Sequence, residues 1–115
     1  MLITVMKSKI HQAVVTGTEL HYEGSIAIDK TLMEAAKIYP NEIVQVLNLN
    51  NGSRMNTYVI EAEKGSGKVS LQGPAARLGQ KGDIIIIISY CHLQPEEIAG
   101  HRPITVKVDS KNKPK

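Results

Sequence analysis

Aromatic residues are scarce in this chain of 115 residues. It has no Phe and no Trp, and its only aromatic side chains are those of four tyrosines. Because 42% of the residues are nevertheless hydrophobic, the core has to be built from aliphatic side chains. We therefore regard the tyrosines as candidates for roles that use the phenolic hydroxyl. They are Tyr22, Tyr39, Tyr58 and Tyr90.

The chain has only one cysteine, no long apolar run and no strong net charge. A single cysteine, Cys91, excludes an internal disulfide framework. No apolar run approaches the ~18 residues of a membrane helix, and the N-terminal residues lack the organisation of a signal peptide. We therefore expect a cytoplasmic protein without a membrane partner. The net charge of +3 comes mostly from a tail over 109–115. The sequence lacks a basic stripe with stacking aromatic residues, so we do not expect a nucleic-acid partner.

The histidines and the cysteine do not form a metal-binding pattern. Cys91 and His92 are neighbours at the end of a predicted strand, so their side chains point to opposite faces. His11, His21 and His101 lack metal-ligand spacing with them. We expect no metal site.

Short strands separated by turn signals dominate the sequence. β-branched runs predict strands over 2–10, 13–16, 26–28, 43–49, 54–62, 69–71, 84–89 and 104–108. Asn51-Gly52 predicts a hairpin turn, and five consecutive isoleucines over 84–88 predict a strand that is buried on both faces. A helix is expected over 30–38 after Asp29 as N-cap, with short helical turns near 74–78 and 94–98. The prediction is one mostly β barrel domain over 1–108 and a flexible basic tail over 109–115.

The dipeptide Gly24-Ser25 lies between two predicted strands, with polar and ionisable side chains just before it. Gly24 has no Cβ, so the peptide around it can adopt backbone angles that are closed to other residues, at a strain of ~1–3 kcal/mol. The hydroxyl of Ser25 could then attack the carbonyl of Gly24 and convert the amide into an ester. Taken alone, the pair indicates only a turn.

Two rows of polar side chains share strand faces. Lys9 and His11 are two residues apart on one predicted strand, so both project from the same face. Arg54, Asn56 and Tyr58 likewise share one face of another strand, and Thr57 lies on the opposite face. Each row, by itself, is typical of a solvated strand face.

Four segments have to be considered together. They are Lys9-Ile10-His11, His21-Tyr22-Glu23-Gly24-Ser25-Ile26-Ala27-Ile28-Asp29, Asn51-Gly52-Ser53-Arg54-Met55-Asn56-Thr57-Tyr58 and Gly73-Pro74-Ala75-Ala76. In sequence and spacing, this combination resembles the pyruvoyl-dependent aspartate 1-decarboxylases. The resemblance covers nearly the whole chain, from residue 1 to about residue 108.

The resemblance implies a fold, an assembly and a processing step. The fold is expected to be a six-stranded double-psi β-barrel with a few short helices, assembled as a homotetramer with active sites between neighbouring subunits. The chain is expected to be made as a proenzyme, or zymogen, that cuts itself between Gly24 and Ser25. The products are a short chain of residues 1–24 and a longer chain of residues 25–115. Some members of the family need a maturation factor for this cut.

The implied cofactor is a pyruvoyl group made from Ser25. After the hydroxyl attack, the ester loses its acyl group by β-elimination, and hydrolysis of the resulting imine releases ammonia. The family assigns stabilisation of the oxyanion to the residue that matches Thr57. The ketone then forms a Schiff base with L-aspartate and acts as an electron sink while CO2 leaves. The implied product is β-alanine, a precursor of pantothenate and coenzyme A, which makes the protein a lyase.

The resemblance also assigns roles to individual residues. Tyr58 matches the proposed proton donor of the family, and Lys9 and Arg54 match the cations that hold the substrate carboxylates. The other residues that match the lining of the site are His11, Tyr22, Thr57, Gln72, Gly73, Pro74 and Ala75.

Two positions depart from the pattern of the family. It usually has Asn where this chain has Gln72, and Ala where this chain has Pro74. Gln72 carries its amide one methylene further out, and Pro74 removes a backbone N–H group. We expect the fold to be unaffected and processing or turnover to be slow.

Two alternatives stay open at this point. One is a pyruvoyl decarboxylase with the same fold and a different substrate, such as glutamate. The other is a double-psi barrel in which Gly24-Ser25 stays intact and which binds a partner or nucleic acid without catalysis.

Overall fold

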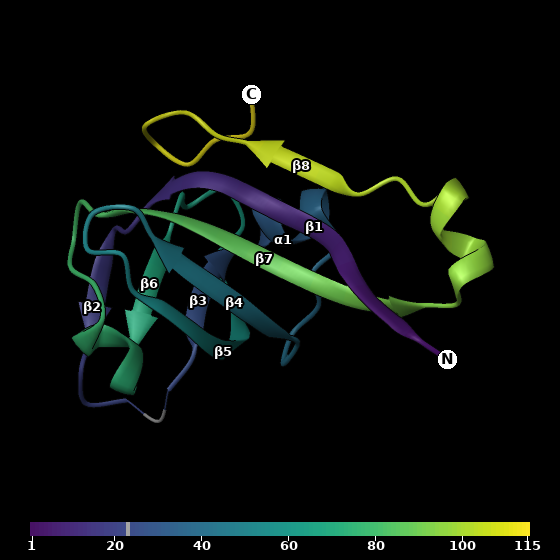
Figure 1. The fold of residues 1–115 in the computed structure, drawn as a ribbon. Helices are drawn as coiled ribbons and strands as arrows, with labels where there is room; N and C mark the ends of the chain where they lie inside the picture. The colour runs from purple at the N-terminus through teal and green to yellow at the C-terminus, as the bar shows by residue number, and fades with distance from the viewer. Residues whose placement is uncertain (23) are drawn as a thin grey trace.

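The computed structural model describes residues 1–22 and 24–115, and it is mostly β (Figure 1). Its strands form one sheet with the order β2-β6-β3-β5-β4-β7-β1-β8. The strands are β1 (Ile3–Val14), β2 (Gly17–Glu19), β3 (Ile26–Asp29), β4 (Ile43–Asn48), β5 (Arg54–Ala62), β6 (Val69–Gln72), β7 (Ile84–Leu93) and β8 (Ile104–Lys107). The helical elements are α1 (Lys30–Ala36) and the 3-10 helices η1 (Gly73–Arg77) and η2 (Pro95–Gly100). The prediction of a mostly β fold with a few short helices is confirmed.

The sheet is strongly curled. Only Val15 and Thr16 separate β1 from β2, although β2 lies at one end of the sheet order and β1 next to the other end. The N–H of Thr16 donates to the carbonyl of Val69 on β6 at 2.8 Å, and the N–H of Val15 donates to the carbonyl of Asp83, just before β7, at 2.9 Å. This short connection therefore holds the two ends of the sheet together.

The core is aliphatic, as the lack of Phe and Trp predicts. Its largest fully buried side chains are isoleucines, valines, leucines and one methionine from the strands and α1. All residues of β3 are buried, and β3 pairs in parallel with β5 and antiparallel with β6. Because β3 begins directly after Ser25, this buried strand fixes the position of the Gly24-Ser25 dipeptide.

The isoleucine strand is buried on one face only within a single chain. In β7, Ile85 and Ile87 are fully buried, whereas Ile84, Ile86 and Ile88 are half-buried. The prediction of burial on both faces is therefore wrong for one chain, because the sheet turns only one side of β7 toward its own core.

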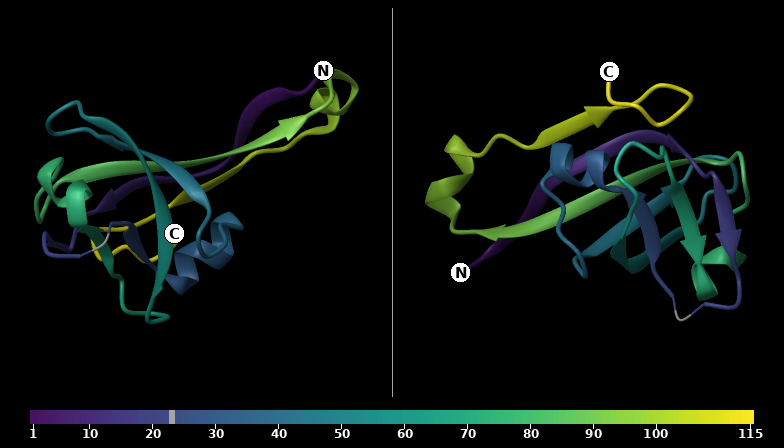
Figure 2. Two further views of the ribbon diagram at one scale, coloured as in Figure 1. Left: turned by 90° about the horizontal axis from the view of Figure 1, so that it is seen from below. Right: turned by 180° about the vertical axis from the view of Figure 1, so that it is seen from behind.

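The longest strands leave the rest of the sheet together. Parts of β1, β7 and β8 extend with η2 as an arm (Figures 1 and 2), and the molecule measures 43 × 28 × 24 Å. β1 is continuous over the range where the sequence predicts two strands. Gln12 adopts φ 60° at a register shift against β7, so the irregular residue is a bulge within one strand. No helix of the described residues is both long and apolar enough to cross a membrane.

The C-terminal segment 109–115 packs against the sheet, which differs from the flexible tail that the composition predicts. The side chain of Asn112 is buried and donates to the carbonyls of Val14 and Gly67 at 2.8 and 2.9 Å. It also accepts a hydrogen bond of 2.7 Å from the N–H of Val14. One buried amide thus satisfies three backbone groups, and this tertiary contact leaves no signal in a lysine-rich sequence.

Asp29 joins the start of α1 to the turn before β6. Its Oδ1 accepts from the N–H of Thr31 at 2.8 Å and of Gly65 at 2.9 Å, and its Oδ2 accepts from the N–H of Gly67 at 2.8 Å. Burial opposes ionisation of this carboxyl, but the hydrogen bonds from Gly67, Gly65 and Thr31 outweigh it and lower the pKa of Asp29 below its usual value. The predicted N-cap is confirmed, and it also anchors the far end of β3.

We predict that Asp29→Asn lowers the free energy of unfolding by about 1–3 kcal/mol, because an amide N–H then faces the N–H of Gly67. Since the pKa of Asp29 is lowered on folding, the carboxylate stabilises the fold above its unfolded pKa, and this contribution is lost as the pH falls through the folded value. Urea unfolding from neutral to acidic pH measures both effects.

Glu34→Gln is the matched control. Glu34 pairs with Lys64 at 3.0 Å on the exposed surface, where such pairs contribute ~0–1 kcal/mol. Equal losses in the two variants would contradict the anchoring role of Asp29, as would an unchanged acid dependence in Asp29→Asn.

Candidate active site

Ser25 lies at the start of β3 and is almost completely buried. Its side chain is 1% exposed, and its backbone φ is 104°, which residues other than glycine rarely adopt. Gly24 before it has φ 132°. Glycine adopts a positive φ without cost, so the backbone strain at this peptide bond lies at Ser25.

Gln72, at the end of β6, holds both the side chain and the backbone of Ser25. The hydroxyl of Ser25 donates to Oε1 of Gln72 at 3.0 Å, and the N–H of Gln72 donates to the carbonyl of Ser25 at 3.0 Å. An amide oxygen is too weak a base to remove the hydroxyl proton. Gln72 therefore orients Oγ without activating it.

Gly73 lies against the backbone that precedes Ser25. A Cβ on Gly73 would lie 2.6 Å from the carbonyl oxygen of Tyr22, 2.6 Å from the nitrogen of Gly24 and 2.7 Å from its Cα. Gly73 also has φ 63°, so glycine is required here for both space and conformation. The corner between β6 and η1 thus supports Gly24 from one side.

A pocket of about 240 Å³ opens on the other side of Ser25, between β5 and η1. The residues that line it are Gly24, Ser25, Met55, Asn56, Thr57, Tyr58, Pro74, Ala75 and Leu78. A Cβ built on Gly24 would lie 3.7 Å from Cε1 and 3.9 Å from Oη of Tyr58, so the phenol borders this peptide. The structure therefore brings together five predicted site residues, namely Ser25, Thr57, Tyr58, Pro74 and Ala75.

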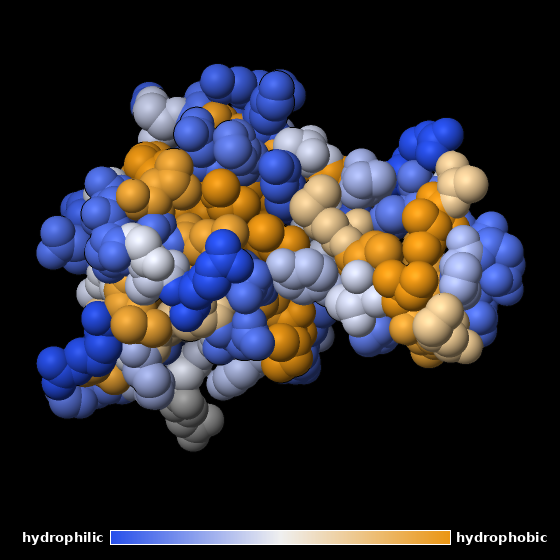
Figure 3. All heavy atoms as spheres, viewed as in Figure 1, coloured by the Kyte–Doolittle hydropathy of each residue, from blue (hydrophilic) through white to orange (hydrophobic). Residues whose placement is uncertain are grey.

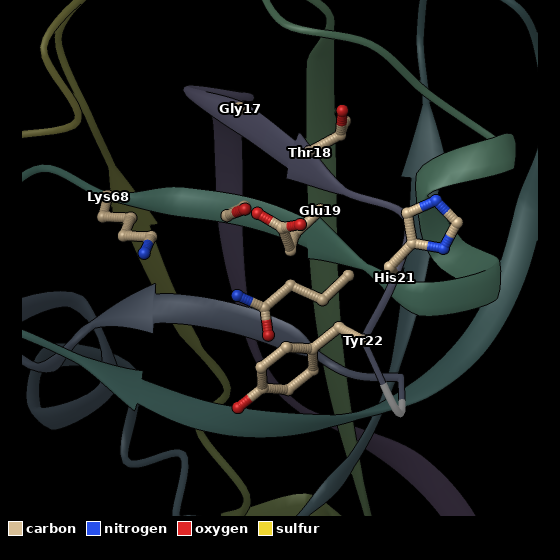
Figure 4. Close-up of a pocket in the computed structure, with 8 residues that line it drawn as sticks. Gly17, Thr18, Glu19, His21, Tyr22 and Lys68 are labelled. Carbon is tan, nitrogen blue, oxygen red and sulfur yellow. The ribbon is translucent and has the colours of Figure 1, made fainter.

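A larger pocket of about 580 Å³ lies beside β2 and β6 (Figure 4). Its lining residues are Gly17, Thr18, Glu19, His21, Tyr22, Lys68, Ser70 and Gln72. Two predicted site residues, Tyr22 and Gln72, therefore line this pocket and not the one at Ser25. Gln72 connects the two spaces through its bond to the hydroxyl of Ser25.

Lys9, on β1, is far from the pocket at Ser25 within one chain. Successive cross-strand pairs run from Lys9 to Ile88, from Ile88 to Gln45 and from Gln45 to Asn56. Three strand spacings correspond to roughly 14 Å. His11 follows Lys9 on the same strand, so the β1 residues of the predicted site do not reach Ser25 in the isolated chain.

Arg54 is exposed at the start of β5 and does not line the pocket. Arg54 lies two residues before Asn56 on the same strand, and Asn56 does line the pocket. Across the strands, Arg54 pairs with Leu47 of β4. Among the described residues, no ion pair is found for Arg54 or for Lys9.

An apolar band separates the two polar rows on the outer face of the sheet. Ile43 and Leu47 of β4 and Ile86 and Ile88 of β7 form this band, which is interrupted by the polar Gln45 of β4, and Ile43 is 63% exposed. Figure 3 shows apolar side chains gathered on the face that is viewed in Figure 1. A single chain therefore leaves apolar surface accessible between its cationic side chains.

Sequence reasoning assigned no site role to three residues that line the pocket at Ser25. Asn56 is one of them, although the sequence already places it on the same strand face as Arg54 and Tyr58. Met55 and Leu78 carry no such signal. Residues 1–22 and 24–115 contain no group of three or more His, Cys, Asp or Glu that could hold a metal ion.

The family model and the relatives described below match the whole chain or nearly all of it. A family model described as aspartate decarboxylase matches residues 1–115. The aspartate 1-decarboxylase of Thermoanaerobacter pseudethanolicus is 59% identical over 110 residues, which cover 96% of this chain and 94% of the relative. That of Neisseria meningitidis is 54% identical over 113 residues, which cover 98% and 89%. The chain belongs to the aspartate decarboxylase family.

Proposed function

We propose that this chain is a self-processing, pyruvoyl-dependent decarboxylase that converts L-aspartate to β-alanine and CO2. Relatives named aspartate 1-decarboxylase, at 52–59% identity over nearly the whole chain, support the reaction. The observation that supports self-processing is that Ser25, a buried residue other than glycine, follows Gly24 with a backbone φ of 104°. The β-alanine would enter pantothenate biosynthesis in the cytoplasm.

Cleavage begins when Oγ of Ser25 adds to the carbonyl carbon of Gly24. The amide C–N bond breaks as the ester forms, and the nitrogen of Ser25 becomes a free amine that takes up the proton. Thr57, in the same pocket, is the proposed donor to the oxyanion. β-Elimination then releases Gly24 as a carboxylate, and addition of water with loss of ammonia leaves a ketone at residue 25.

The surroundings of Ser25 fit a pyruvoyl group. When formed, this group supplies a carbonyl that can accept the electrons of the departing carboxylate. The amide carbonyl of residue 25, which is attached to the ketone, already accepts a hydrogen bond from the N–H of Gln72. This bond favours electron density on that oxygen. Tyr58, which borders Gly24, is the proposed proton donor.

The two departures from the family pattern fit the structure. The longer side chain of Gln72 reaches the hydroxyl of Ser25 at 3.0 Å. Pro74 occupies the first turn of η1, where the N–H groups have no partner within the helix. Pro74 therefore removes at most one backbone N–H that could donate to a ligand. For this reason we still expect this chain to turn over its substrate slowly.

We infer that a second copy of the chain completes the site. Lys9 and His11 lie about three strands away from the pocket, and an apolar band lies between the two rows. Nδ1 of His11 is buried without a hydrogen-bond partner among the described residues. A ligand or a neighbouring subunit could supply the missing partner. A homotetramer with sites at the subunit interfaces accounts for these features.

The curled sheet supports a six-stranded double-psi barrel as the finer description of the fold. Processing would divide it into residues 1–24 and 25–115, which stay together because β1 pairs with β7 and β8, and β2 pairs with β6. No metal is needed, because the ketone at residue 25 acts as the electron acceptor.

The proposed reaction predicts that the wild-type protein forms β-alanine from L-aspartate, whereas Ser25→Ala stays one chain and forms none. Ser25→Ala should retain the fold, which circular dichroism can check. Turnover by Ser25→Ala would contradict the pyruvoyl mechanism, and a processed wild type that acts on L-glutamate but not on L-aspartate would favour the alternative substrate.

We predict that Gly73→Ala slows self-cleavage more than about tenfold, because its Cβ would displace Gly24, and ~1 Å of misplacement can cost ~100-fold in rate. Intact mass against time measures the cut. Gly100→Ala is the matched control, since a Cβ there meets open space. Equal cleavage rates in the two variants would show that the corner does not position Gly24.

A shared site predicts complementation between two inactive variants. In mixed oligomers, a Ser25→Ala chain can supply Lys9 to the processed site of a Lys9→Ala chain, so co-expression should restore β-alanine formation. Mixing Lys9→Ala with the double variant Ser25→Ala/Lys9→Ala is the control, because no Lys9 is then present. Mixed oligomers without recovered activity would place the whole site within one subunit.

A further inference from the structure

The carbonyl oxygen of Leu78 accepts hydrogen bonds from three side chains of the β4–β5 hairpin. Nδ2 of Asn51 donates at 2.9 Å, Oγ of Ser53 at 3.0 Å and Nδ2 of Asn48 at 3.3 Å. A carbonyl oxygen has two lone pairs, so three donors are more than it needs to be satisfied. We call this arrangement the Leu78 clamp.

The clamp joins the two walls of the pocket at Ser25. Leu78 follows the end of η1 and lines the pocket with Pro74 and Ala75. Ser53 comes directly before β5, which supplies the opposite wall. The distance between the two walls is therefore restrained at the clamp.

The hairpin does not need these donors to form its turn. Oδ1 of Asn51 accepts from the N–H of Ser53 at 2.9 Å, and the N–H of Asn48 donates to the carbonyl of Ser53 at 2.9 Å. The N–H of Gly52 donates to the carbonyl of Asn48 at 2.9 Å. Because the turn is closed by these bonds, Nδ2 of Asn51 and Oγ of Ser53 are free to hold Leu78.

We propose that Asn51 and Ser53 are positioning residues that set the width of the pocket and the placement of Arg54, and thereby the binding of the substrate. Arg54 follows Ser53 directly, so a shift of the hairpin moves its guanidinium relative to Ser25. This inference rests on the proposed function and on the role that the family resemblance implies for Arg54, namely holding a carboxylate of L-aspartate.

The clamp should act on substrate binding and not on self-cleavage. Gly24 and Ser25 are held by Gln72 and Gly73, at the opposite end of η1 from Leu78. Loosening the hairpin therefore leaves the support of the scissile peptide in place and changes the wall that the substrate contacts.

Three single variants separate the clamp from the turn. Ser53→Ala removes one donor, and Ser53→Thr keeps the hydroxyl as the matched control. Asn51→Asp keeps the Oδ1 acceptor of the turn but replaces the Nδ2 donor by an oxygen that repels the carbonyl of Leu78. Each processed protein is assayed for KM and kcat with L-aspartate, and the extent of cleavage is read from the intact mass.

We expect Ser53→Ala to raise KM about two- to tenfold, the factor that corresponds to one neutral hydrogen bond. Asn51→Asp should raise KM at least as much, while Ser53→Thr stays near wild type, with kcat and cleavage close to wild type in all three. Unchanged KM in Ser53→Ala and Asn51→Asp would overturn the inference, as would an equal rise in Ser53→Thr or a loss of cleavage. A wild type that neither cleaves nor decarboxylates would instead overturn the proposed function.

Discussion

The paired hydrogen bonds between Gln72 and Ser25 are the interaction on which the site depends. They join the end of β6 to the start of β3, and the next residue, Gly73, allows η1 to approach the backbone of Gly24. At the other end of β3, Asp29 holds the strand through three N–H groups. A strained peptide can persist only where the surroundings hold it in this way from both sides.

In the proposed assembly, the same sheet would divide the site between copies of the chain. One face of the central strands forms the aliphatic core, and the other carries cationic residues on both sides of an apolar band. We propose that the half-buried isoleucines of β7 belong to an interface between these copies. Under this view, assembly supplies both burial and catalytic groups.

Local patterns predicted most of the elements, whereas tertiary contacts account for the differences. β-branched runs, the Asn51-Gly52 turn and the Asp29 cap are encoded within a few residues, so they could be found from the sequence. The continuity of β1 depends on a bulge at Gln12, and the packing of the C-terminal segment depends on the buried amide of Asn112. The separation of Lys9 from Ser25 follows from strand order, which no local pattern contains.

The most direct test of self-processing is the intact mass of the denatured, purified protein. The account predicts two chains, residues 1–24 with a free carboxylate at Gly24, and residues 25–115 lighter by one ammonia than a chain that begins with Ser25. A single unmodified chain that persists on long warming, even with extract of the source cells added, would contradict it.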